Sequence, residues 1–281
     1  MKTIIGIGEA VWDVFPDARR AGGSPANVAF HVQKLGHRGR VVSRVGLDED
    51  GDELVAWFAG KGLDTDFIQR DVQKPTGTVP ILLVDGEPQF TITEDVAWDY
   101  LALTDELRAV LPQTDAICLG TLAQRSPVTS STIKAVLREL PASCLRVLDL
   151  NMRPPYWTSE LVMHVLPLAD VIKLNQTEKA ALEEMAGVSD AHDWLLEQFG
   201  ITYICQTYGR DGAALRTRNG YWRVAGEPVD TSNGDAVGVG DAFLAALIHG
   251  LLRSETSENT LQFANRYAAQ VAMHRGAMPD F

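Results

Sequence analysis

Short apolar runs alternate with amphipathic segments along most of this 281-residue chain. The apolar runs lack the polar alternation of half-exposed strands, so we expect strands that are buried on both faces. These runs span residues 3–8, 39–45, 116–119, 145–150, 171–174 and 203–207. Helical patterns lie between them at residues 25–35, 53–61, 127–140, 178–186 and 191–199. This alternation predicts an α/β fold with a mostly parallel central sheet.

Two stretches depart from the alternation. Residues 77–84 and 89–93 flank Asp85-Gly86, a hairpin signal, and predict antiparallel strands away from the main sheet. Residues 241–252 and 258–273 predict two consecutive helices. Because the sequence has no repeat and no clear linker, we expect one domain over residues 1–281 with a small β appendage.

Composition excludes several classes of function. A net charge of −12 disfavours nucleic acid as a partner, because phosphate-backbone binding needs clustered Lys and Arg. The sequence has no apolar span long enough for a membrane helix, and its opening segment is too short and too soon acidic for a signal peptide. Cys118, Cys144 and Cys205 lie in apolar runs and are expected to be buried free thiols. We therefore expect a cytoplasmic protein without a membrane partner.

The strongest local signal is a glycine-rich turn at residues 234–241 that leads directly into a helical pattern. The unpaired N–H groups at such a helix start favour negative charge, as on a transferring phosphoryl group. Asp241 is an acidic residue in this setting. It is either an ordinary helix cap or a base that accepts a hydroxyl proton beside the anion hole.

A second glycine turn occupies residues 21–27. Ser24 and Pro25 are typical of an N-cap and a first helical residue, and capping explains both completely. Capping does not explain Gly22-Gly23, which let a ligand approach the backbone closely. Asn27 is either solvated or a ligand-binding amide.

Together the two turns resemble the two signature segments of the ribokinase-like sugar kinases, the phosphofructokinase-B group. The matching segments are AGGSPANVAFHVQKLG at 21–36 and DAVGVGDAFLAAL at 235–247. The resemblance extends over nearly the whole chain, and GEAVWD, TGTVP, VAWDY, DLNMRPPYW and KLNQTE look most like the fructokinase-type branch. The resemblance implies a three-layer αβα sandwich with a mostly parallel central sheet. It also implies a small β lid from about residues 11–21 and 66–95.

The resemblance also implies roles for individual residues. Asp241 would be the catalytic base, and the backbone of Gly238, Val239 and Gly240 the anion hole. The implied sugar-binding residues are Asp13, Gly22, Gly23, Asn27 and Arg153. The implied ATP-binding residues are Asn175, Glu178, Thr207, Gly209, Gly212 and Asn265. Glu178 would hold Mg²⁺ through water, and Asp235 with the carbonyl of Val237 would form a monovalent-cation site suited to K⁺.

Some residues depart from the family pattern. Ala236 and Val239 replace the usual Thr and Ala of the second signature, which is tolerable where N–H groups form the hole. The segment between Asp13 and Gly22 is very short, so any lid there is small, and a homodimer through the lid stays open. Gly6 and Gly8 do not make a dinucleotide fingerprint, because Val11 stands at the third glycine position. The sequence contains no Walker-type phosphate loop, so the later turn must bind the phosphates.

The expected activity is ATP-dependent phosphorylation of a primary sugar hydroxyl, with D-fructose giving fructose 6-phosphate as the first choice. Ribose, 2-keto-3-deoxygluconate and a sugar phosphate remain as alternative substrates. The sugar phosphate is considered because Arg19 and Arg20 precede the first glycine pair, although a solvated basic pair looks the same. A non-catalytic sugar or nucleotide sensor on the same fold is the alternative from another class.

Overall fold

The computed structural model describes residues 1–15, 18–84 and 87–281. Within these residues the central sheet has nine strands in the order β13-β12-β11-β10-β9-β8-β1-β4-β5. The strands are β1 (Thr3–Ile7), β4 (Arg38–Gly46), β5 (Ile68–Asp71), β8 (Ala116–Gly120), β9 (Leu145–Asp149), β10 (Val171–Asn175), β11 (Tyr203–Thr207), β12 (Ala213–Thr217) and β13 (Gly220–Val224). From β5 to β11 all neighbours are parallel, whereas β12 and β13 are antiparallel. The predicted α/β class and mostly parallel sheet are confirmed.

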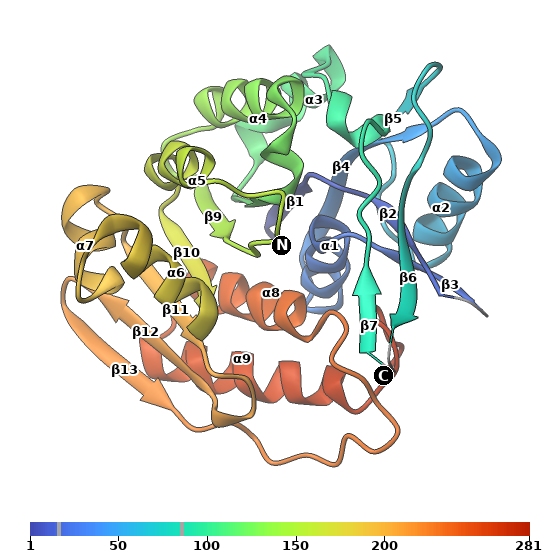
Figure 1. The fold of residues 1–281 in the computed structure, drawn as a ribbon. Coiled ribbons are helices and arrows are strands. Elements are labelled where there is room, and N and C mark those ends of the chain that lie inside the picture. The colour runs from blue at the N-terminus through green and yellow to red at the C-terminus, as the bar shows by residue number, and fades with distance from the viewer. Residues whose placement is uncertain (16–17, 85–86) are drawn as a thin grey trace.

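Helices cover both faces of this sheet (Figure 1). One layer contains α1 (Ser24–Lys34), α8 (Val239–Leu252) and α9 (Ser257–Ala272). The opposite layer contains α3 (Asp105–Val110), α4 (Pro127–Glu139), α5 (Ser159–Val165), α6 (Gln176–Ala186) and α7 (Ala191–Gln198). The remaining helix, α2 (Glu49–Gly60), packs beside β4 at one edge. Single 3-10 turns lie at Ala97–Tyr100, Leu111–Gln113, Leu122–Arg125, Leu166–Leu168 and Gly209–Asp211.

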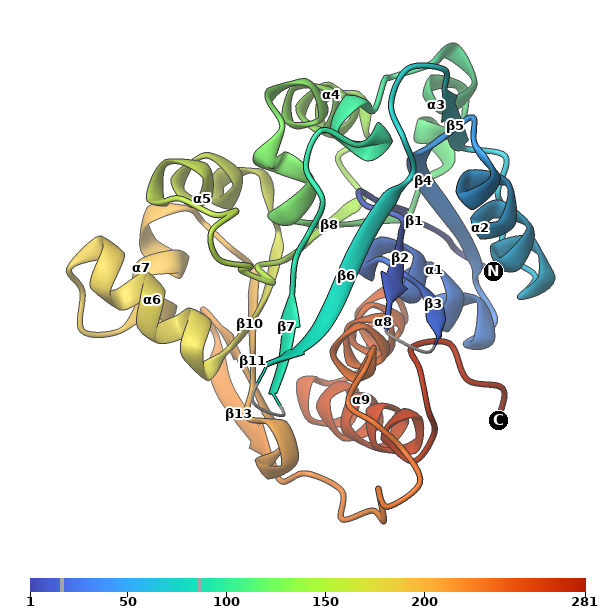
Figure 2. The ribbon, with the colours of Figure 1, turned by 45° about the vertical axis from the view of Figure 1, so that its right-hand side comes forward.

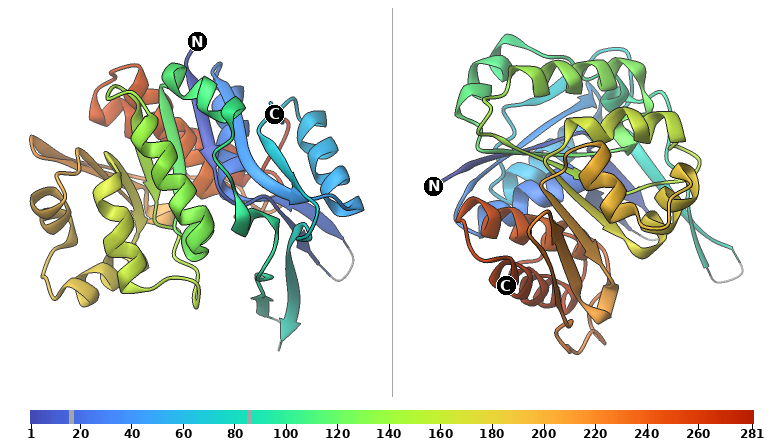
Figure 3. Two further views of the ribbon diagram at one scale, coloured as in Figure 1. Left: turned by 90° about the horizontal axis from the view of Figure 1, so that it is seen from above. Right: turned by 90° about the vertical axis from the view of Figure 1, so that its left-hand side faces the viewer.

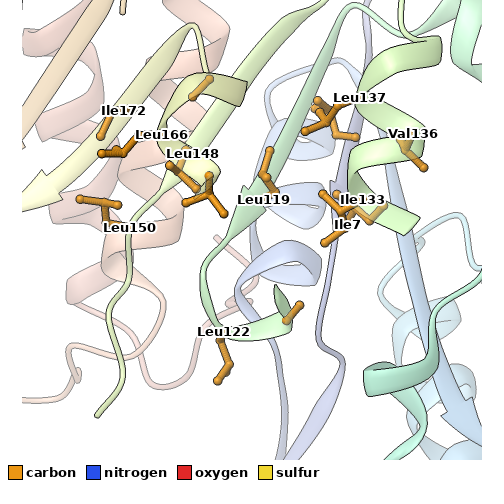
Figure 4. Packing of buried hydrophobic residues seen from close by; sticks show 14 of the residues in the cluster. Ile7, Leu119, Leu122, Ile133, Val136, Leu137, Leu148, Leu150, Leu166 and Ile172 are labelled. Atoms are coloured by element: carbon orange, nitrogen blue, oxygen red, sulfur yellow. The ribbon is translucent and has the colours of Figure 1, made fainter. Parts of the chain in front are cut away.

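Successive residues of the central strands point to opposite layers, because side chains alternate along a strand. Ile4 packs in the core under α8 and α9, whereas Ile5 and Ile7 pack on the other face. On that face Ile7 lies beside Ile133 of α4, and Leu148 lies near Leu166, all in one apolar cluster (Figure 4). Both faces are apolar, which explains why the predicted strands lack polar alternation.

A second, smaller sheet has the strand order β3-β2-β6-β7. Its strands are β2 (Val11–Val14), β3 (Arg19–Gly22), β6 (Gly77–Val84) and β7 (Glu87–Phe90). Figure 2 shows β2, β3 and β6 close together, and Figure 3 shows β6 and β7 projecting from the body of the molecule. The predicted antiparallel pairing is confirmed for β6 and β7, and the proposed turn at residues 85–86 lies outside the described residues. The segment at β5, within the range expected for the lid, pairs with β4 in the central sheet.

Several elements were not predicted. The antiparallel edge strands β12 and β13 follow the turn at Gly209 and Gly212, both of which have positive φ. Short helices α3 and α5 were also missed, as was the separate pairing of β2 with β3. No helix of the described residues is long and apolar enough to cross a membrane.

Candidate active site

Asp241 lies in the first turn of α8 and does not cap the helix. The capping position belongs to Gly238, at φ 72°, and no side chain makes a capping hydrogen bond there. The two oxygens of Asp241 instead accept hydrogen bonds from the start of α1. Oδ1 accepts from Ser24 Oγ at 2.7 Å, and Oδ2 accepts from Asn27 Nδ2 at 2.7 Å. The interpretation of Asp241 as an ordinary N-cap is therefore wrong.

The N-terminus of α1 corrects a second expectation. The capping residue is Gly23, at φ 112°, and Ser24 makes no side-chain capping bond. Because its hydroxyl donates to Asp241, Ser24 is a candidate site residue. The sequence did not indicate this role, because a serine at this position is typical of a helix cap. Asn27 is buried, with 5% of its surface exposed, so it is not a solvated amide.

The glycine pair before α1 is required by the chain itself. A Cβ at Gly22 would lie 2.8 Å from Asp13 Oδ2, and one at Gly23 would lie 2.4 Å from the carbonyl oxygen of Glu9. These glycines therefore permit a close approach to Asp13 and Glu9, and their expected contact with a ligand stays a prediction.

Behind Asp241 lies a buried ion pair that sequence reasoning did not single out. Lys173 Nζ on β10 donates to the two carboxylate oxygens of Asp149 on β9 at 3.0 and 2.8 Å. Burial disfavours the ammonium, but the adjacent Asp149 carboxylate raises the pKa of Lys173 above its ordinary value. A Cβ at Gly240 would lie 3.5 Å from Lys173 Nζ, so this fixed positive charge lies beside the glycine turn.

These neighbours set the protonation of Asp241. Burial and the negative charge of Asp149 raise the pKa of Asp241, whereas the hydrogen bonds from Asn27 and Ser24 and the charge of Lys173 lower it. The net effect is a raised pKa, which makes the ionised carboxylate a stronger base toward a hydroxyl proton.

Two further carboxyl groups, Glu9 and Asp13, belong to residues that lie beside the glycine pair before α1. Glu9 follows β1 and is 4% exposed, and its Oε2 has no hydrogen-bond partner among the described residues. Burial, helped by the negative charge of Asp241, raises the pKa of Glu9 to about 7, against the lowering effects of backbone hydrogen bonds and Arg153. Burial also raises the pKa of Asp13 to about 6, against the lowering effects of Arg153 and Arg20. Arg153 is exposed in the segment after β9 and lowers the pKa of both acids.

Asn175 and Glu178 form a reciprocal capping box at the start of α6. Asn175 Oδ1 accepts from the Glu178 N–H at 2.9 Å, and Glu178 Oε2 accepts from the Asn175 N–H at 2.8 Å. Glu178 Oε1 accepts a third N–H, from Met152, at 3.0 Å. Each oxygen therefore keeps one free lone pair, with which it could contact Mg²⁺ directly or through water. Among the described residues, no three acidic, His or Cys side chains form a metal cluster.

The residues expected at the nucleotide lie along the adjacent edge of the sheet. Thr207 pairs in register with Asn175, which places both at the carboxyl ends of their strands. Gly209 and Gly212 follow at φ 60° and 97°, and a Cβ at Gly212 would lie 2.1 Å from the Val224 carbonyl oxygen. Asn265 on α9 is buried and donates to the Ala225 carbonyl at 3.2 Å. Gly212 thus lets the turn between β11 and β12 lie close against the end of β13.

The turn before α8 is tied to distant segments through Asp235. Its Oδ1 accepts from the Val237 N–H at 3.0 Å, and its Oδ2 accepts from the Gly276 N–H at 3.0 Å. Oδ2 also accepts from Arg20 Nη1 on β3 at 3.2 Å. Of the predicted anion-hole groups, the Val239 N–H lies 3.4 Å from the Ala236 carbonyl oxygen, a weak contact.

The profile described as pfkB family carbohydrate kinase matches residues 8–281. The chain belongs to this family. A fructokinase of Vibrio alginolyticus is 28% identical over 296 residues, which cover 96% of this chain and 93% of that protein.

Solved structures agree with the family assignment. An uncharacterized sugar kinase from Pyrococcus horikoshii, in complex with ATP, has a TM-score of 0.85 at 27% identity and covers 99% of this chain and 94% of its own. A fructokinase with bound ATP from Xylella fastidiosa has a TM-score of 0.87 at 25% identity and covers 98% of this chain and 94% of its own. The ribokinase-like fold of this pfkB-family chain, with its small lid-like sheet, is thereby confirmed.

In this pfkB-family kinase the first and second signature segments meet at one point. Asn27 and Asp241 are in contact, and Gly22 lies against Asp13. The predicted nucleotide residues Asn175 and Thr207 lie on neighbouring strands, whereas Arg153 lies in an exposed loop. Ser24, Lys173 and Glu9 are the additional candidates, and only burial or contacts over long sequence distances identify them.

Proposed function

We propose that this chain transfers the γ-phosphoryl group of ATP to a primary hydroxyl of a sugar, with D-fructose as the foremost substrate. The observation that carries the proposal is the Asp241 carboxylate, oriented by Ser24 and Asn27 in the first turn of α8. A pure binding protein has no need of a buried acid beside an anion-attracting helix start. The relatives named as fructokinases favour fructose, and the ATP complexes of two relatives favour ATP.

In the proposed reaction Asp241 accepts the proton of the sugar hydroxyl. The hydroxyl oxygen forms a bond to the γ-phosphorus as the bond to the bridging oxygen of ADP breaks. Free N–H groups at the start of α8, near Gly240, interact with the charge on the transferring group. Lys173 adds a fixed positive charge beside this turn, and its ion pair with Asp149 keeps it there.

The sugar would lie between the start of α1 and the small sheet, where Asp13 and Asn27 offer a carboxylate and an amide to its hydroxyls. Arg153 lies near enough to these acids for its charge to lower the pKa of both Glu9 and Asp13. Mg²⁺ would neutralise phosphate charge when it is bound with the nucleotide, and Glu178 would hold it through water. Thr207, Gly209, Gly212 and Asn265 would contact the nucleotide along β11 and α9.

A sugar panel tests the proposal directly. The purified chain is given ATP and Mg²⁺, and ADP release is measured with D-fructose, ribose, 2-keto-3-deoxygluconate and fructose 6-phosphate. We expect the highest kcat/KM with D-fructose and product phosphorylated at its primary hydroxyl. A preference for another sugar would replace fructose and keep the kinase. Tight sugar or ATP binding without turnover of any sugar would contradict the kinase and favour a sensor.

A further inference from the structure

Asp235 has little capacity left for a metal ion. Its Oδ2 accepts from both Arg20 Nη1 and the Gly276 N–H, which uses the two lone pairs of that oxygen. Its Oδ1 accepts from the Val237 N–H. Only one lone pair, on Oδ1, is left, so this carboxylate offers a cation at most one ligand position and suits the expected cation site poorly.

Arg20 already provides a positive charge next to the Asp235 carboxylate. Its guanidinium forms an ion pair with Asp235 at 3.2 Å, with side-chain exposures of 40% and 26%. A guanidinium is charged at every physiological pH, unlike a bound ion whose occupancy depends on concentration. A second cation at Asp235 would also be repelled by Arg20, because like charges a few ångströms apart interact unfavourably.

Arg20 joins Asp235 to the substrate side of the molecule. It lies on β3 directly opposite Asp13 on β2, and its charge lowers the pKa of Asp13. Its guanidinium also lies over the Phe15 ring, 4.9 Å from the centroid. One side chain thus connects the small sheet with the turn that leads into α8. The neighbouring Arg19 differs, because it pairs with Asp50 and Glu53 of α2.

We propose that Arg20 takes the place of a monovalent cation at Asp235 and positions the turn before Asp241, so that the protein works without K⁺. The part of this proposal that concerns turnover rests on the proposed sugar kinase activity. The part that concerns ion binding rests only on the contacts of Asp235.

The experiment compares KCl with tetramethylammonium chloride at equal ionic strength, using wild type, Arg20→Ala and Arg19→Ala. Thermal unfolding and ADP release with the best sugar of the panel are both measured. For wild type and Arg19→Ala we expect the same Tm in both salts and turnover within about twofold, because a screened general salt effect is equal in both. Arg20→Ala should lose about tenfold or more in turnover without K⁺, since a charge-assisted contact is lost. K⁺ should restore part of that turnover and raise the Tm of this variant alone.

The outcomes separate the two proposals. A rise in wild-type Tm or a several-fold rise in wild-type turnover with K⁺ would overturn the role of Arg20. Full turnover of Arg20→Ala without K⁺ would overturn it as well. If Arg20→Ala does not fold, Arg20→Gln, which keeps hydrogen-bond donors and loses the charge, takes its place with the same expectations. If no sugar is phosphorylated, the kinase proposal fails, and the response of the wild-type Tm to K⁺ still decides the role of Arg20.

Discussion

Asn27 Nδ2 donates a hydrogen bond of 2.7 Å to Asp241 Oδ2, across 214 residues of sequence. Ser24 Oγ makes the matching bond to the other oxygen at 2.7 Å. Both carboxylate oxygens are thereby held by the first turn of α1. The backbone of α8 fixes the position of the Asp241 Cα. A reacting hydroxyl must approach through the lone pairs that remain, so α1 sets the direction of proton transfer.

Asp241→Asn tests the proposed base. The amide cannot take the hydroxyl proton, so kcat should fall by about 10²–10⁴-fold while ATP binding changes little. Steady-state ADP release and ATP titration measure the two effects. Asp230→Asn is the matched control, because Asp230 lies in the segment before the same turn and is exposed, with a hydrogen bond from the nearby Ser232 N–H. Near-wild-type turnover of Asp241→Asn would remove Asp241 from the mechanism.

Ser24→Ala tests how the pKa of Asp241 is set. Burial raises this pKa, and the hydroxyl of Ser24 lowers it, so removing the hydroxyl should raise it further. A base with a higher pKa is ionised only at higher pH. The acidic limb of the kcat profile should therefore move upward, by a few tenths to about one pH unit. The exposed Ser232→Ala serves as control, and an unshifted limb in Ser24→Ala would contradict the assignment.

Lys173→Met should destabilise the fold strongly. It leaves the buried Asp149 carboxylate without its partner, at a cost of about 3–5 kcal/mol in the free energy of unfolding. Urea denaturation measures the loss. Lys2→Met breaks the exposed pair with Asp115 and should cost less than about 1 kcal/mol. Equal losses in the two variants would mean that the inner ion pair has no special role in stability.

Glu9 makes stability depend on pH. Its pKa is raised from 4.5 to about 7 in the folded state. Between pH 4.5 and about 7 the folded protein therefore keeps a proton on Glu9 that the unfolded chain has released. Stability from this group is therefore complete below the unfolded pKa and is lost as pH rises through the folded pKa, by roughly 3 kcal/mol in all.

Glu9→Gln has no such proton to lose. The difference between the Tm of Glu9→Gln and that of wild type should become more positive as pH rises from about 5 to about 8. Differential scanning calorimetry over this range measures the difference. Glu160→Gln, at an exposed position in the first turn of α5, should follow wild type throughout. A constant difference between Glu9→Gln and wild type would show that Glu9 does not titrate in this range.

Gly22→Ala should act on sugar binding through Asp13. The added Cβ would lie 2.8 Å from Asp13 Oδ2, so the carboxylate must move from its place. We expect the sugar KM to rise about tenfold with a small change in the ATP KM, since hydrogen bonds to a charged group are lost. Gly60→Ala at the end of α2 is the control, because its Cβ meets nothing within 4 Å. An unchanged sugar KM would argue against Asp13 as a sugar ligand.

The sequence predicted the central strands well because both faces of each are apolar. Ile4 and Ile5 belong to cores on opposite faces, and this leaves a continuous apolar run. The edge strand β13 alternates between half-buried and exposed residues, so it does not resemble a buried run. Strands β2 and β3 have four residues each and include Gly22, so they are too short to resemble one. Local propensity describes residues packed inside the sheet better than those at its margins.

Site residues whose partners are near in sequence could be predicted, whereas residues whose partners are distant in sequence could not. The capping box of Asn175 and Glu178 follows from a spacing of three residues. Ser24 satisfied every local rule for a cap, yet its partner lies 217 residues away. Lys173 lies in an apolar run, and only the neighbouring strand shows that Asp149 neutralises it.

The contact between α1 and α8 also joins two parts of the chain that are synthesised far apart in time. A chain leaves the ribosome from its N-terminus, so Ser24 and Asn27 emerge long before Asp241. Folding of β1, α1 and β4 can begin early, but the carboxylate that α1 orients arrives only with α8. A chain that ends before residue 241 therefore lacks the proposed base, so the proposed activity can begin only after the start of α8 has been synthesised.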